Sequence, residues 1–116
     1  MEYNNDFKYD LKLGQIHEQW LGTLFTDSTI EVKRDYMADR TGNVFIEFES
    51  RGRPSGISTS MAEYWAFVLT DHRVVIVPTD VLKEVAREQY RKSCIVKGGD
   101  SNTSRGVLIK IGDLVK

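Results

Sequence analysis

The chain has 116 residues, of which 41% are hydrophobic and 28% charged, a composition typical of one globular domain with its own core. Its formal net charge of -1 excludes a general electrostatic attraction to nucleic acid, so contact with DNA requires a local basic patch. The single cysteine, Cys94, excludes an internal disulfide, and no apolar run is long enough to cross a bilayer. We therefore expect a cytoplasmic protein in which residues 1–116 form one domain.

The first predicted element is a helix that begins at Leu13. We expect the polar residues 1–10 before it to be loosely held. From Leu13 onward the apolar residues recur at steps of three and four, as one face of a helix requires. Glu18 falls just beyond the edge of that face, so we expect it at the rim of a cleft. The apolar face consists of Leu13, Ile16, Trp20 and Leu24.

Two strands follow, over residues 30–36 and 44–49, where apolar and charged residues alternate with a period of two. Gly42 and Asn43, which lie between them, tolerate a positive φ and are typical of a turn. We therefore predict an antiparallel β-hairpin whose apolar face packs in the core. The opposite face of this hairpin carries Glu31, Lys33, Asp35, Glu47 and Glu49.

The charged face of the hairpin allows two interpretations. Antiparallel hairpins commonly have one solvated face, and there Lys33 would form only a weak cross-strand salt bridge. The acids outnumber the lysine, however, and their repulsion would be relieved by a cation. Carboxylates are the ligands that Mg²⁺ or Mn²⁺ prefers, and a lysine beside such an ion can orient water for attack on a phosphodiester.

The rest of the chain predicts a loop, two strands, a helix and a last strand. Residues 49–59 are rich in Gly, Pro and Ser and read as a loop. Residues 62–70 and 73–79 are apolar on both faces, as expected of central strands. Residues 80–92 have helical periodicity, and residues 107–111 form a final strand. The order of elements predicts an α+β fold with a single mixed sheet flanked by helices.

The loop after the second strand contains candidate phosphate ligands. Arg51 and Arg53 follow the acidic strand directly, and Ser55 and Gly56 could bring backbone N–H groups to a phosphate. Lys97 and Arg105 are expected to lie behind these arginines. A plain turn with solvated arginines is the alternative interpretation.

Two short motifs resemble those of the PD-(D/E)xK nuclease superfamily, especially the archaeal and phage Holliday-junction resolvases. Gly14 and Glu18 match a Gly-x-x-x-Glu helix, and Glu31-Val32-Lys33 matches Glu-x-Lys. Residues 41–65 are similar to small uncharacterised phage proteins usually placed in this superfamily. The resemblance covers about half of the chain, from Gly14 to Trp65.

The resemblance implies a restriction-endonuclease-like core and a Mg²⁺-dependent or Mn²⁺-dependent endonuclease acting on DNA, with branched or junction DNA as one candidate substrate. Glu18, Glu31 and Glu47 would then hold the metal, and Lys33 would orient the attacking water. It also implies a homodimer and, for a phage-encoded chain, the cytoplasm of the host. The alternative is a non-catalytic interaction or nucleic-acid-binding domain that keeps the nuclease fold.

The sequence departs from the family pattern at the acid that should precede Glu-x-Lys. Asp27 is too close in sequence to Glu31 to lie on a separate paired strand. A migrated pattern, in which Glu31 and Glu47 are the acids and Lys33 comes from the first strand, fits the predicted hairpin better. The sequence leaves open whether Asp27, Asp35 and Glu49 are metal ligands or take no part in the site.

Overall fold

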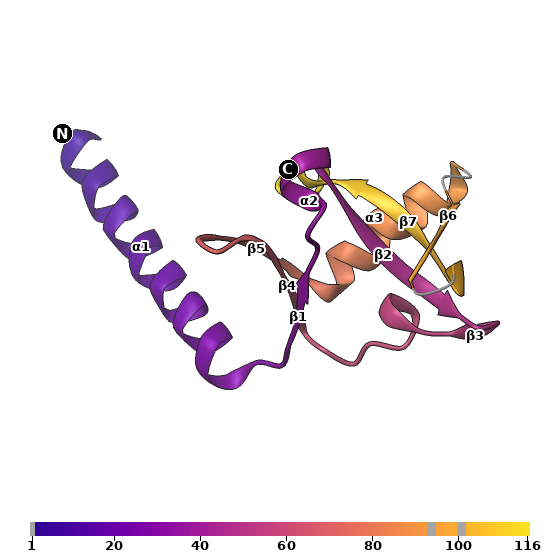
Figure 1. Cartoon of the computed structure of the whole chain (residues 1–116). Coiled ribbons are helices and arrows are strands. Elements are labelled where there is room, and N and C mark those ends of the chain that lie inside the picture. The colour runs from indigo at the N-terminus through magenta and orange to yellow at the C-terminus, as the bar shows by residue number, and fades with distance from the viewer. Residues whose placement is uncertain (1, 93–94, 100–101) are drawn as a thin grey trace.

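Figure 1 shows a long N-terminal helix, α1 (Glu2–Asp27), that stands away from a body made of two β-sheets and shorter helices. This computed structural model describes residues 2–92, 95–99 and 102–116, so Cys94 lies outside the described residues. The projecting helix makes the molecule elongated, with extents of 63 × 29 × 27 Å. None of the helices in this described part is long and apolar enough to cross a membrane.

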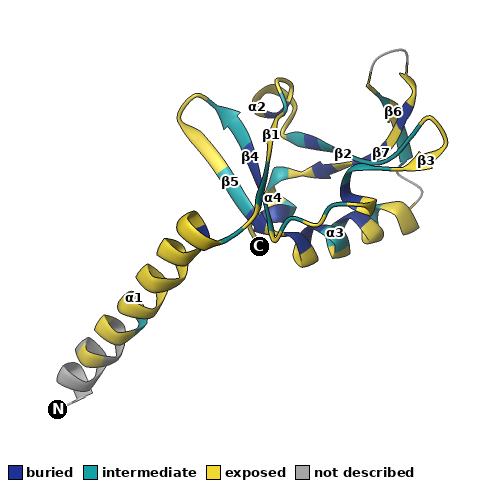
Figure 2. Cartoon of the chain, turned by 90° about the horizontal axis from the view of Figure 1, so that it is seen from below, coloured by how far each residue is buried: buried dark blue, intermediate teal, exposed yellow. Residues whose placement is uncertain are grey.

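The structure confirms the predicted N-terminal helix but not its start or its burial. Helix α1 begins at Glu2 rather than Leu13, so residues expected to be loosely held belong to it. Leu24 is buried, whereas Ile16 and Trp20 are about half exposed. Figure 2 shows that the described part of α1 is exposed along most of its length. Helix α1 meets the body near its C-terminal end, where Trp20 Nε1 donates a 3.2 Å hydrogen bond to the Tyr64 hydroxyl, and the backbone N–H of Glu63 donates a 3.0 Å hydrogen bond to the carbonyl of Thr29 just after the helix.

The first sheet contains three strands in the order β1 (Ile30–Arg34), β4 (Tyr64–Thr70) and β5 (Arg73–Pro78). Strands β4 and β5 form the antiparallel pair expected from their apolar runs, and β1 joins β4 in parallel. Strand β4 is central and largely buried. Strand β5 lies at the edge, where Val74 is 52% exposed, so the prediction of two fully covered strands is wrong for β5.

The second sheet has four antiparallel strands. The prediction of a single mixed sheet is therefore wrong, because the strands form two separate sheets. Strand β2 pairs on one side with the short β3 and on the other with β7, which in turn pairs with β6. The bounds of these strands are β3 (Arg53–Pro54), β2 (Asn43–Ser50), β7 (Ser104–Lys110) and β6 (Ile95–Gly98).

The predicted hairpin between the first two strands is wrong. A helical turn, α2 (Ala38–Thr41), separates β1 from β2 and ends at Gly42, which has a φ of 77°. Val44 and Ile46 on β2 are fully buried and need apolar neighbours. Strand β7 supplies these neighbours, whereas Val32 on β1 is 63% exposed and does not face the core as predicted.

Helix α3 (Thr79–Arg91) covers both sheets on one side and closes the core (Figure 1). Its Leu82 and Ala86 are buried among side chains of β2, β4 and β7, as the helical periodicity predicted, whereas Tyr90, expected on the same buried face, is 53% exposed. A 3-10 turn, η1 (Gly56–Ser58), and a C-terminal helix, α4 (Ile111–Leu114), add Ile57 and Leu114 to the same core. The structure thus confirms the α+β class, with α3 on one face of β2.

Candidate active site

A hollow of about 800 Å³ lies between the two sheets, on the face of β2 opposite to α3. Alternation along β2 sends Val44 and Ile46 into the core, so Phe45 and Glu47 face the hollow. The lining also includes Lys33 at the end of β1 and Asp35 just after it. Three of the charged residues of the predicted hairpin face therefore reach one space, although their strands do not pair.

Lys33 is held at this hollow by two contacts. Its Nζ lies 3.2 Å from a carboxylate oxygen of Glu31 and 5.7 Å from the centre of the Trp65 ring. Trp65 is only 2% exposed, so it is a fixed wall against which the ammonium lies. The Lys33 side chain itself remains 49% exposed, so the ammonium can contact a bound anion.

Asp35 is the carboxylate whose role the sequence left open, and the structure gives it a defined position. Its two oxygens accept hydrogen bonds of 3.0 Å from the backbone N–H groups of Met37 and Phe45. These bonds tie the end of β1 to β2 and fix the orientation of the carboxylate. Each oxygen keeps a further lone pair for a ligand in the hollow.

Glu47 is oriented by the loop that follows β2. One of its carboxylate oxygens accepts a 2.8 Å hydrogen bond from the Ser55 hydroxyl. Gly56 has a φ of 55° and packs so closely on the Glu47 backbone that a Cβ would overlap the Glu47 carbonyl oxygen. Only glycine therefore fits at position 56, and the loop holds Glu47 at the hollow.

The predicted convergence of Glu18, Glu31 and Glu47 is wrong. Glu18 lies on the exposed part of α1, and Glu31 is paired with Lys33 rather than opposed to Glu47. Among residues 2–92, 95–99 and 102–116, no three Asp, Glu, His or Cys side chains form a metal-ligand group. The physical reason is that β1 pairs with β4, so the two acids belong to different sheets.

The acid pair that does share the hollow is Asp35 and Glu47. Two carboxylates with room for water suit Mg²⁺ or Mn²⁺, which commonly take one or two protein carboxylates and retain several waters. The donor set therefore fits such a cation. The sequence signal for Asp35 was its place two residues after Lys33, which puts both on one side of an extended segment.

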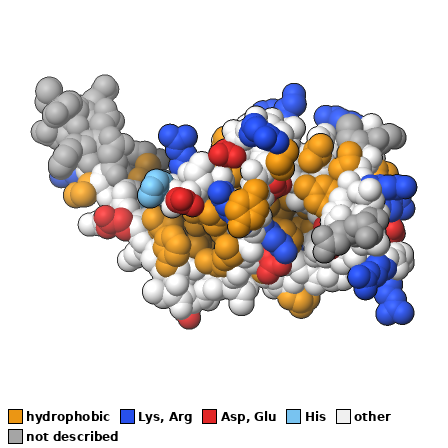
Figure 3. Space-filling model, in the orientation of Figure 1, with side chains coloured by type: hydrophobic (Ala, Val, Ile, Leu, Met, Phe, Trp, Pro, Cys, Tyr) orange, Lys and Arg blue, Asp and Glu red, His pale blue; other side chains and the backbone are white. Residues whose placement is uncertain are grey.

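Basic side chains gather at the end of the molecule that carries β3 and β6 (Figure 3). Arg51 and Arg53 flank the exposed β2–β3 turn, and Lys97 lies opposite Arg105 across the β6–β7 pair. A guanidinium nitrogen of Arg105 lies 3.5 Å from a carboxylate oxygen of Glu49. Glu49 is thus paired with an arginine and is not among the residues that line the hollow. The backbone N–H of Ser55, expected to contact a phosphate, instead donates a hydrogen bond to the Phe48 carbonyl within the protein.

Comparison of the chain with protein-family models, with curated proteins and with solved structures returns no match.

Proposed function

We propose that this protein is a metal-dependent endonuclease that hydrolyses phosphodiester bonds of DNA, in the cytoplasm, with branched or junction DNA as a candidate substrate. The observation that supports this proposal most strongly is that Lys33, Asp35 and Glu47 line one hollow. A lysine and two carboxylates that face one hollow are the kinds of side chain that metal-assisted phosphodiester chemistry uses.

In this proposal each side chain has a distinct role. Asp35 and Glu47 would hold a Mg²⁺ or Mn²⁺ ion, and the backbone and hydroxyl donors on them keep them oriented. The ion would supply charge neutralisation at the phosphate and a lower pKa for bound water. Lys33, fixed by Glu31 and Trp65, would orient the attacking water or stabilise negative charge that develops on the phosphate.

The basic end of the molecule is the proposed contact for the DNA backbone. Gly99, just after β6, lines the hollow, so the strand that carries Lys97 ends at the hollow. Arg51 and Arg53 are exposed nearby on the β2–β3 turn and have no ion pair within the described residues. Phosphate contacts by these cations would position the duplex without reading its sequence.

Cleavage of DNA by matched variants tests this proposal. Linear and branched DNA are incubated with the protein and Mg²⁺ or Mn²⁺, and product is followed on gels. We expect cleavage by the wild type, loss of at least about 100-fold in Glu47→Gln and Lys33→Ala, and retention in Glu49→Gln, which alters the acid paired with Arg105. If the wild type does not cleave, or if Lys33→Ala cleaves equally well, the proposal is wrong.

A second candidate function, a non-catalytic interaction domain, is favoured by the surface of α1. Large apolar side chains are exposed along this helix, including Leu11, Leu21 and Phe25, which is 64% exposed. Most of the stability of helices in proteins comes from packing of an apolar face, so the exposed apolar side chains of α1 fit a packing partner. We propose that a second copy of the chain covers it, since a homodimer would bury two such faces against each other.

Thermal melting with and without metal separates the two functions. A protein with a cation site gains stability by linkage when millimolar Mg²⁺ is added, whereas an interaction domain does not. We expect a higher Tm with metal for the wild type and an unchanged Tm for Glu47→Gln. An equal rise in both proteins would place the cation elsewhere.

A further inference from the structure

A second cavity, of about 340 Å³, lies between α3 and the core-facing side of β2. Phe48 lines it from β2, and Ile57 and Ser58 line it from η1. Glu47, the neighbour of Phe48, faces the hollow on the opposite side of the strand. This cavity is therefore separate from the proposed catalytic hollow and has no role in the chemistry described above.

One end of the cavity is cationic. Lys83 and Arg87 stand one helical turn apart on α3, and both line the cavity. Neither side chain forms a hydrogen bond or an ion pair with any of the residues that the structure describes, whereas the side chain of Glu88 on the same helix is paired with Arg91. Like charges at this spacing repel each other, and an anion between them would remove that cost.

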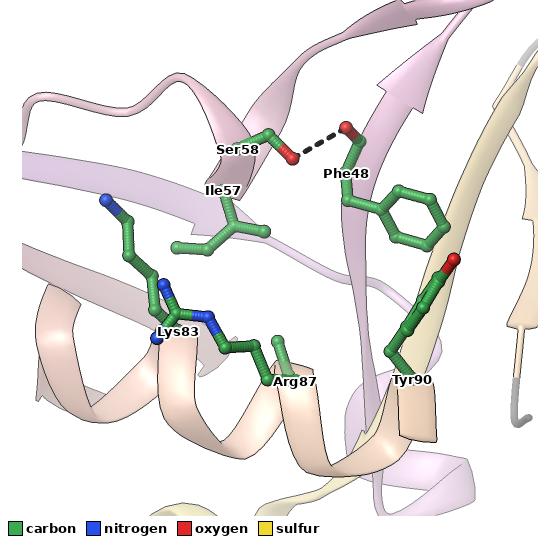
Figure 4. Close-up of a pocket in the computed structure, with 7 residues that line it drawn as sticks. Phe48, Ile57, Ser58, Lys83, Arg87 and Tyr90 are labelled. Carbon is green, nitrogen blue, oxygen red and sulfur yellow. Dashed lines mark hydrogen bonds between the residues drawn. The ribbon is translucent and has the colours of Figure 1, made fainter. Parts of the chain in front are cut away.

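The other end of the cavity is aromatic. The rings of Phe48 and Tyr90 meet edge to face, with centroids 5.6 Å apart and an interplanar angle of 86°. Tyr90 is 53% exposed, so part of its ring is open to a ligand. Figure 4 shows the Arg87 side chain extending along α3 toward Lys83, whose amine points away past Ile57, while Phe48 and Tyr90 lie together at the opposite end.

The bottom of the cavity is apolar between these two ends. Ile57 and Ala86 are 5% and 8% exposed and form an apolar surface along which a flat group can lie. The Ser58 hydroxyl donates a 2.8 Å hydrogen bond to the Phe48 carbonyl, so its oxygen can accept one from a ligand hydroxyl. The site thus offers two cations, one acceptor and two aromatic rings.

We propose that this cavity binds a nucleotide unit, with the phosphate on Lys83 and Arg87 and the base against Tyr90 and Phe48. A nucleoside monophosphate consists of an anion, a hydroxylated sugar and a planar ring, in that order. The cavity offers the matching features in the same order: two cations, the Ser58 acceptor and two aromatic rings. Base stacking on aromatic side chains and phosphate binding by basic ones are common in single-strand recognition. The volume suits a small ligand of this kind. The source of the unit is either a free nucleotide or an unpaired nucleotide of a DNA strand.

Binding without divalent cations tests this site independently of cleavage. The full chain is titrated by calorimetry with dAMP, with deoxyadenosine, with inorganic phosphate and with a short single strand of deoxyadenylate. We expect saturable binding of dAMP or of the strand, and binding at least about ten-fold weaker for the nucleoside and for phosphate alone, because each lacks one half of the ligand. A strand that binds tighter than dAMP identifies DNA as the source, and equal affinities identify the free nucleotide.

Two arginines on the same helix provide the matched variants. Arg87→Gln removes a cation of the cavity and is expected to weaken nucleotide binding at least about ten-fold. Arg91→Gln removes an exposed cation that is paired with Glu88 outside the cavity, and it should bind like the wild type. The proposal is overturned if neither dAMP nor the strand binds saturably, if phosphate alone binds as well as either, or if Arg91→Gln loses as much affinity as Arg87→Gln.

Discussion

Replacement of Gly56 by alanine is expected to disturb both stability and the position of Glu47. The backbone at Gly56 has a φ of 55°, a conformation that side chains with a Cβ rarely adopt. The added methyl would also overlap the Glu47 carbonyl oxygen. Because this neighbour is backbone and not a flexible side chain, the overlap is relieved only if η1 moves away from β2.

The cost of Gly56→Ala has three parts. The left-handed backbone costs about 1–2 kcal/mol for alanine. Movement of η1 would break the 2.8 Å hydrogen bond from Ser55 to Glu47, which contributes about 1 kcal/mol. Displacement of the buried Ile57 adds about 1 kcal/mol of lost apolar contact. We therefore expect the free energy of unfolding to fall by about 3–4 kcal/mol.

Gly52→Ala is the matched control for this prediction. Gly52 also has a positive φ, 78°, but no atom lies within 4 Å of the position that its Cβ would take. It should therefore show only the backbone cost, about 1–2 kcal/mol. Urea unfolding measures both values, and cleavage with Mg²⁺ should fall more in Gly56→Ala. If both variants lose equal stability, Gly56 does not pack closely against the Glu47 backbone.

Three further perturbations test the core, the link between the sheets and α1. Leu82→Ala should lower the free energy of unfolding by about 2–5 kcal/mol, and Val81→Ala, on the exposed side of α3, by less than about 1 kcal/mol, both measured by urea unfolding. Asp35→Ala leaves two backbone N–H groups without their acceptor and should cost about 2 kcal/mol by the same measurement; no loss of stability would show that these bonds are absent. Phe25→Lys should convert a homodimer to a monomer in sedimentation experiments, and a monomeric wild type would contradict the proposed use of α1.

The local elements could be predicted from the sequence because local patterns determine them. Strands β4 and β5 follow from two apolar runs joined by a short turn, and α3 follows from its helical periodicity. The pairing of β1 and β2 could not be predicted in this way. Their partners lie far along the chain, with Ile30 opposite Tyr64 and Asn43 opposite Lys110, and an alternating pattern does not specify its partner strand.

The candidate site was predictable in part for the same reason. Lys33 and Glu47 were predicted from alternation, which fixes the side of the strand to which each points. Asp35 was left open because its role depends on a bond to Phe45 across the α2 turn. Glu18 was assigned to the site on the assumption that α1 packs over the sheets, and the helix projects from the body instead.

The central claim is that Asp35 and Glu47 hold a divalent cation in the hollow, and paramagnetic broadening by Mn²⁺ tests it most directly. Mn²⁺ is added stepwise to ¹⁵N-labelled protein, and the loss of each backbone amide signal is followed by NMR. We predict that the amides of Asp35, Glu47 and Gly56 broaden at the lowest Mn²⁺ concentrations, and that Glu47→Gln removes this early broadening. Broadening that begins at Asp113 on α4, which is paired with Lys116, or that is unchanged in Glu47→Gln, would contradict the account.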